Sequence, residues 1–125
     1  MNKAKLVARV ILGLIFVVFG LNGFLGFLPM PPLPEEAGKL MGAFAAAGYM
    51  FPMIKGLEVI VGILLLANLF VPLALILLAP ITVNILLFHG VLAPAGMALP
   101  LVILVLHLFL AYAHKESYET VLKMK

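Results

Sequence analysis

The sequence lacks the residues on which several kinds of enzyme chemistry depend. Its 125 residues include no cysteine and no tryptophan, and they include a single serine, Ser117. The chain can therefore form no internal disulfide, no thiolate nucleophile and no cysteine metal site. It also has no phosphate-binding glycine loop, no His-x-x-x-His pair and no serine-nucleophile motif. We accordingly predict no metal site, and no residue is identified as catalytic.

Charged residues are also scarce. They make up 10% of the chain, whereas 66% of the residues are hydrophobic. A soluble domain carries roughly 25% charged residues, so this composition indicates a membrane protein. The net charge of +3 arises mainly at the two ends of the chain, and no basic stripe indicates a nucleic-acid partner. The cations at the two ends are Lys3, Lys5, Arg9, Lys115, Lys123 and Lys125.

Four apolar segments have a length suited to crossing a bilayer as helices, for which about 20 residues are needed. They cover about residues 6–28, 51–70, 73–88 and 97–113. We expect the first to be an uncleaved span, because no small-x-small site ends a short apolar core. The prolines of residues 29–34 should then hold the chain extended. A short helix at about 36–48 follows, either re-entrant over the mouth of the bundle or lying on the headgroups.

Both basic ends should lie in the cytoplasm, which requires an even number of spans. The sequence therefore predicts an all-α membrane protein: a four-helix transmembrane bundle with both termini cytoplasmic and an extra short helix between spans one and two. It forms a single integral domain over residues 1–125, multi-pass in the inner (cytoplasmic) membrane. Arg9 should extend to the inner headgroups.

Glu58 is the residue around which we expect any function to centre. It lies within the second apolar segment, where an ionised side chain costs on the order of 3 kcal/mol. Lys55 precedes it by three residues on the same helical face and can form an ion pair with it. That pair can serve a function, or it can only fix the packing of the helices.

Three further polar residues should lie at a similar depth, since Asn22, Asn84 and His89 come near the outer ends of their spans. The helical rise places this layer roughly 7–11 Å below the outer boundary. Together with Glu58 and Lys55, these side chains are our candidate ligand-binding residues. The asparagines can instead be hydrogen-bonding contacts between helices. His107, on an apolar helix, should bond to a neighbouring carbonyl.

Several segments resemble DoxX-like membrane proteins. They are RVILGLIF at 9–16 with FGLNG at 19–23, KGLEVIVGILLL at 55–66, and NILLFH at 84–89. The resemblance extends over roughly residues 6 to 113. It implies a four-span helical bundle in the cytoplasmic membrane. A related DoxD protein is a subunit of a thiosulfate:quinone oxidoreductase, so the resemblance also implies a quinone as cofactor and a redox enzyme subunit as partner.

Two functions remain open at this stage. The chain departs from many family members in having Gly23 where a basic residue often stands, and it has no cysteine. No redox cofactor site is evident, so we do not expect a complete enzyme. The first function is binding of a small molecule or lipid at Glu58, or assistance to a membrane assembly. The second is a quinone-associated subunit of a membrane oxidoreductase. Membrane lipid is an expected partner, and a homo-oligomer would fit the large apolar surface.

Overall fold

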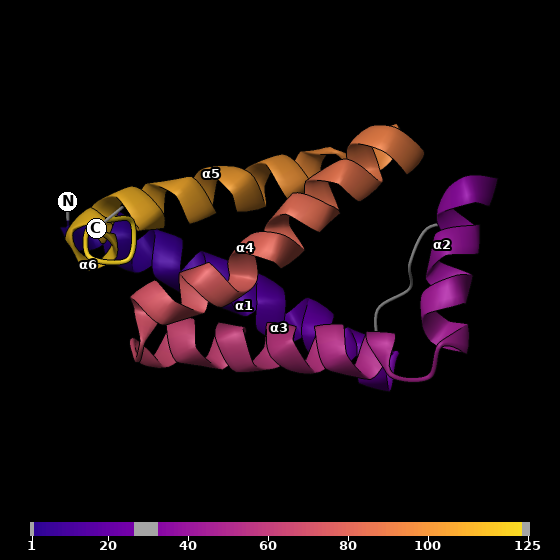
Figure 1. Cartoon of the computed structure of the whole chain (residues 1–125), viewed down its shortest axis with the longest axis horizontal. Coiled ribbons are helices and arrows are strands. Elements are labelled where there is room, and N and C mark those ends of the chain that lie inside the picture. The colour runs from indigo at the N-terminus through magenta and orange to yellow at the C-terminus, as the bar shows by residue number, and fades with distance from the viewer. Residues whose placement is uncertain (1, 27–32, 124–125) are drawn as a thin grey trace.

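The computed structural model describes residues 2–26 and 33–123, which form helices and no strand. Figure 1 shows the order of the elements along the chain. The α-helices are α1 (Asn2–Leu25), α2 (Glu35–Ala46), α3 (Met50–Ala67), α4 (Val71–Leu87), α5 (Ala98–Ala113) and α6 (Lys115–Tyr118). Two short segments join α4 to α5: a π-helix, η1 (Phe88–Leu92), and a 3-10 turn, η2 (Pro94–Gly96).

Three of the described helical segments are long and apolar enough to cross a bilayer. They cover Lys3–Leu25, Met50–Ala67 and Val71–Leu92, and a shorter apolar helix covers Ala98–Ala113. The fold is therefore that of an all-helical membrane protein, as the composition predicts.

The helix ends differ from the expected spans for local reasons. α1 ends at Leu25 instead of near residue 28, because Gly26 takes a left-handed conformation with φ +61°. α3 stops at Ala67, since Asn68 is left-handed with φ 57° and its amide bonds back to the last turn. Beyond Leu87, the helical path continues as the π-turn η1. The expected extended segment of residues 29–34 falls mostly outside the described residues.

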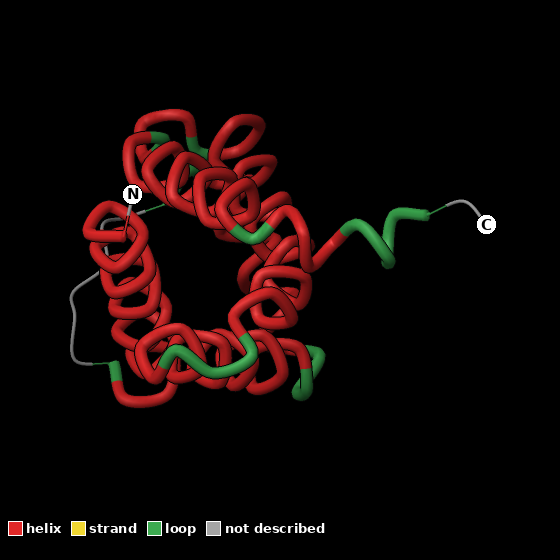
Figure 2. The backbone as a smooth tube through the Cα atoms, turned by 90° about the vertical axis from the view of Figure 1, so that its left-hand side faces the viewer, coloured by secondary structure: helices red, strands yellow, loops and turns green. Residues whose placement is uncertain are grey.

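The long helices are arranged around a common axis, as the end-on view in Figure 2 shows. α1 packs against α3 and α5, and α4 packs against the same two helices. The contact between α1 and α3 is by far the most extensive. Glycines make it close: a Cβ built on Gly62 would lie 2.8 Å from the Gly13 carbonyl oxygen. Small residues bring membrane helices together in this way because packing contacts, not the hydrophobic effect, drive their association.

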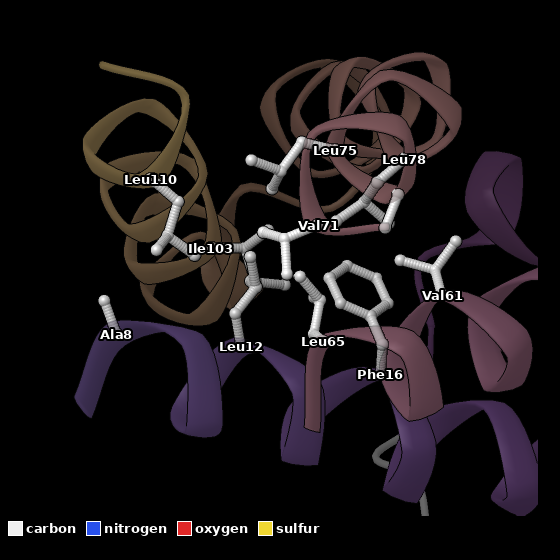
Figure 3. Packing of buried hydrophobic residues seen from close by; sticks show 11 residues of the cluster. Ala8, Leu12, Phe16, Val61, Leu65, Val71, Leu75, Leu78, Ile103 and Leu110 are labelled. Carbon is white, nitrogen blue, oxygen red and sulfur yellow. The ribbon is translucent and has the colours of Figure 1, made fainter. Parts of the chain in front are cut away.

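The apolar core lies toward the end of the bundle that carries the two termini. Side chains from α1, α3, α4 and α5 point toward one another there (Figure 3). Leu12 and Phe16 of α1 are almost fully buried against Leu65 of α3 and Leu75 of α4. This close packing holds the helices in one arrangement. The polar residues of the bundle lie outside this apolar cluster.

The half-buried Arg9 side chain of α1 reaches the end of α3. Its guanidinium Nη1 donates to the carbonyl oxygens of Leu65 and, at 3.1 Å, Leu66. These carbonyls belong to the last turn of α3, where helical amide donors run out, although the Leu65 carbonyl also accepts from the Asn68 amide at 3.3 Å. A cation at the negative end of the α3 dipole is favourable, so Arg9 of α1 caps α3.

At the same end of the molecule, the segment after α5 is tied to the start of α4. The Tyr118 hydroxyl donates to the Pro72 carbonyl oxygen at 2.8 Å. His114, just beyond α5, is half-buried near α1. Burial, together with the charge of Lys5, lowers the pKa of His114, which favours its neutral form. The two ends of the chain therefore lie on one side of the bundle, and α2 lies on the other (Figure 1).

α2 lies across the end of the bundle and not between the long helices (Figure 1). Most of its residues are exposed, and Ala37 is its buried residue. Lys39 forms ion pairs with Glu35 and Glu36 at 3.5 and 3.2 Å. The contact with α3 includes an edge-to-face pair of Phe44 with Phe51. α2 is therefore an exposed, charged helix at one end of the bundle.

A buried polar link joins α4 to α5. Nε2 of His107 bonds the Leu75 carbonyl oxygen at 3.0 Å, and its Nδ1 lies 2.9 Å from Thr82 Oγ1. A carbonyl can only accept, so Nε2 carries the proton and Nδ1 of the neutral ring accepts from the hydroxyl. The expectation that His107 bonds a neighbouring carbonyl is confirmed, and Thr82 is an additional partner.

Replacing His107 with leucine should destabilise the protein by about 1–2 kcal/mol, because two hydrogen bonds between helices are lost. Thr82→Val should cost less, and the double variant should cost less than the sum of the two. Reversible unfolding in SDS micelles, followed by circular dichroism, measures these differences. Val102→Leu, an exposed change on the same helix, is the control. A His107→Leu protein as stable as the wild type would contradict this assignment.

Candidate functional site

A cavity of about 190 Å³ lies among α1, α3, α4, η1 and α5. Its polar side is formed by Lys55, Glu58 and His89. Its remaining lining is apolar: Ile15, Phe16, Phe19, Ile85, Leu99, Pro100 and Ile103. Lys55 is five residues after the start of α3, about 8 Å along the helix. The cavity is therefore nearer to the end of the bundle that carries α2 than to the end with the termini.

Glu58 is buried at this cavity and paired with Lys55. Lys55 Nζ lies 3.5 Å from Glu58 Oε2, and the side-chain exposures are 26% and 5%. The ion pair expected from the i, i+3 spacing is thus present. The aliphatic stem of Lys55 crosses Gly23 of α1, where an added Cβ would lie 2.5 Å from Lys55 Cγ. The missing side chain at residue 23 gives the stem its path toward the carboxylate.

His89 is held in a defined orientation by η1 and η2. Its Nδ1 bonds the Ile85 carbonyl oxygen at 2.8 Å, so Nδ1 carries a proton. Within the described part of the chain, Nε2 forms no hydrogen bond. The ring lies against Gly96 of η2: a Cβ there would be 3.0 Å from His89 Cδ2. In a neutral ring, Nε2 can therefore accept a hydrogen bond from a bound molecule.

The five candidate residues do not all meet at one site. Lys55, Glu58 and His89 line the cavity, but Asn22 and Asn84 are not among its described lining residues. Asn22 is half-buried on α1. Asn84 is exposed on the outer face of α4. It precedes the cavity-lining Ile85 by one residue, and one residue turns an α-helix by about 100°. Similar depth therefore does not bring Asn84 to the carboxylate.

Some residues of the site could not be identified from the sequence as cavity residues. Phe16 and Phe19 supply aromatic walls, and Pro100 closes the side formed by α5. Gly96 and Gly23 act by lacking a side chain where His89 and Lys55 need space. The apolar residues resemble the many others in their helices, so nothing in the sequence separates a cavity wall from a lipid-facing surface.

Replacing Gly96 with valine should move the His89 ring, because the new side chain would fill the space that the imidazole edge occupies. We expect the NMR signals of His89 in protein with isotope-labelled histidine to shift, while those of His107 stay in place. Gly42→Val, in open space on α2, is the control. An unchanged His89 signal in Gly96→Val would show that the ring is not held against this turn.

Comparison with known protein families identifies a family to which the chain is similar, which the geometry of the cavity does not reveal. The DoxX family profile matches residues 4–90. This range includes α1 from its third residue onward, all of α2, α3 and α4, and it ends within η1 after His89. It therefore includes all the polar residues of the cavity. Comparison with curated proteins and with solved structures finds no match.

Proposed function

We propose that the cavity beside Glu58 binds a small molecule or the end of a lipid. The chain belongs to the DoxX family of membrane proteins. The observation that carries this proposal is a buried carboxylate that faces a cavity and not a packed core. An ion pair that only fixed helix packing would need no such space beside it. Binding, rather than catalysis by this chain alone, is the activity that these groups support.

The polar groups of the cavity offer a matched set of hydrogen-bonding contacts. Lys55 can donate to a carbonyl or hydroxyl oxygen, Glu58 can accept from a hydroxyl, and His89 Nε2 can accept as well. The opposite wall is formed by Phe16, Phe19 and aliphatic side chains. The molecule that fits this lining has one oxygen-bearing polar end and an apolar body. Ligand sites are commonly apolar pockets in which a few polar groups fix the orientation of the ligand.

The size of the cavity favours a single ring or a short polar head. A cavity of about 150 Å³ takes a benzene ring, and this one measures about 190 Å³. A quinone ring carries carbonyl oxygens and stacks on aromatic walls, so the quinone-associated subunit is the second candidate. In that case we expect another protein to supply the electrons, since the related DoxD protein is a subunit of a larger oxidoreductase.

We further propose that α1, α3, α4 and α5 all cross the membrane, with both termini in the cytoplasm. Most basic residues, including Lys3, Lys5, Arg9 and Lys115, belong to the end with the termini. Glu35 and Glu36 belong to α2 at the opposite end, where Lys39 and Lys55 are the basic residues. This asymmetry follows the positive-inside rule. The cavity would then lie in the outer leaflet of the inner membrane, where a lipid-soluble molecule can enter from the side.

The proposal is tested by identifying what the protein retains. Wild type and Glu58→Gln are purified in lipid nanodiscs, and small molecules and lipids are extracted and identified by mass spectrometry. We expect one species at near-equal molar amount in the wild type and a loss of about tenfold in Glu58→Gln, since one hydrogen bond to a charged group contributes about 1.5–3 kcal/mol. Glu36→Gln, at an exposed acid of α2, is the matched control.

Titration with a short-chain quinone separates the two candidates. Saturable binding that Glu58→Gln weakens and Glu36→Gln does not would support the quinone-associated subunit. Retention of a lipid without quinone binding would support the first candidate. If wild type retains nothing and Glu58→Gln affects only the stability of the fold, the ion pair is structural and the proposal is wrong.

A further inference from the structure

Asn84 differs from every other residue on the outer faces of the long helices. It lies thirteen residues after Val71 and eight before Leu92, about 20 Å and 12 Å from these two ends along a helical axis. Its side chain is exposed, and within the described residues it forms no hydrogen bond. An amide is thus displayed deep within the longest apolar stretch of α4 and η1.

The surrounding surface makes this position unusual. Among the residues that the structure describes, the other exposed side chains of α1, α3, α4 and α5 are apolar, apart from Lys3 and Tyr112. These two lie near helix ends. Hydrocarbon offers no hydrogen-bonding partner, and a polar group left without one in the bilayer carries a free-energy cost. A polar group from another helix would remove that cost.

We propose that the face of α4 centred on Asn84 is a contact surface for a second copy of this chain. In a dimer with its two-fold axis along the membrane normal, both copies have the same orientation and both Asn84 residues lie at the same depth. A carboxamide carries both donors and an acceptor, so two of them satisfy each other across such an axis. A different partner would need its own polar group at this depth, whereas a second copy supplies one by symmetry.

The residues around Asn84 suit a helix contact. Leu77, Val83 and Leu87 are 38%, 53% and 59% exposed. Leu77 is two turns before Asn84 on the same face. These side chains would pack against their counterparts, and the amide pair would fix the register of the two helices. The surface is on the outside of α4, so the dimer does not depend on whether the cavity at Glu58 binds a molecule.

The absence of cysteine from the chain allows a direct test. Leu77→Cys places one thiol on the proposed interface, and Val105→Cys places one on the exposed face of α5 as a control. Both are prepared in the full chain, in liposomes with a large excess of lipid, and exposed to a mild oxidant. We expect a disulfide-linked dimer from Leu77→Cys and little from Val105→Cys. Adding Asn84→Leu should raise the dissociation constant about tenfold, within the range measured for hydrogen bonds between membrane helices.

Two further variants guard against a misleading result. Asn84→Gln keeps the carboxamide and should retain cross-linking, and the SDS stability of Asn84→Leu shows whether that chain still folds. The proposal is wrong if Leu77→Cys does not cross-link. It is also wrong if Leu77→Cys and Val105→Cys cross-link equally, or if a folded Asn84→Leu protein cross-links as well as the protein with Asn84.

Discussion

Replacing Gly62 with alanine is expected to destabilise the protein by about 1–3 kcal/mol, the usual cost of overpacking a close contact. A Cβ at residue 62 would lie 2.6 Å from Val17 Cγ2 and 2.8 Å from both the Gly13 carbonyl oxygen and the Val17 amide nitrogen. Two of these three contacts are with backbone, so no rotamer change relieves them. α1 and α3 would have to separate along their shared contact, which is the most extensive in the bundle.

Gly56 provides a matched control on the same helix. A Cβ there meets no atom within 4 Å. Gly56→Ala should therefore leave the stability unchanged or raise it, since alanine favours helix by up to about 1 kcal/mol over glycine. Reversible unfolding in SDS micelles gives both values under the same conditions. Equal effects of the two substitutions would mean that α1 and α3 do not pack as closely as the structure shows.

Removing the ion pair as a whole is expected to cost less than removing Lys55 alone. Lys55→Met leaves a 5%-exposed carboxylate without its partner, and loss of one member of a buried pair costs about 3–5 kcal/mol. Glu58→Leu should cost less, because the ammonium is 26% exposed and its flexible stem can turn outward. The double variant should come within about 1–2 kcal/mol of the wild type, since an apolar pair leaves no charge to be solvated.

The same unfolding assay, applied to the four proteins as a double-mutant cycle, yields the coupling energy of the pair. Strong coupling means that each charge is retained mainly because the other is present. A coupling energy near zero would show that water reaches both groups, and the cavity would then not hold a desolvated ion pair. The cycle is measured on protein freed of bound small molecules and lipid, so that ligand binding does not add to the coupling energy.

The sequence predicts helix positions and local pairs well, because these depend on nearby residues. The apolar runs mark the helices, and the Lys55–Glu58 pair follows from a three-residue spacing. The rotation of each helix about its own axis, which decides the face that turns inward, cannot be predicted in this way. α4 is apolar on nearly every side, so no stripe indicates which face turns inward, and the depth of Asn84 does not determine its direction. The contact of Arg9 with α3 could not be predicted for a related reason, since the carbonyl groups that it caps belong to the end of another helix.

His89 illustrates what the sequence could predict only in part. Its depth near the end of the third span follows from counting residues. Its inward direction depends on the wider turn of η1 and on the contact with Gly96. Neither the π-turn nor that contact has a sequence signal. Of the candidate residues, the structure therefore brings the Glu58 carboxylate and the His89 imidazole to one cavity, but not the Asn84 amide.

The length of α5 has a consequence for the lipid around the protein. Its 16 residues extend about 24 Å, against about 36 Å for the 24 residues of α1. The hydrocarbon layer of a bilayer is about 30 Å thick. α5 is shorter than this thickness, and α1 is longer. If α5 crosses the membrane, as we propose, the bilayer should be compressed beside it, while α1 tilts to fit. We expect a protein of this shape to favour thin regions of the membrane and to deform the leaflets unevenly around its circumference.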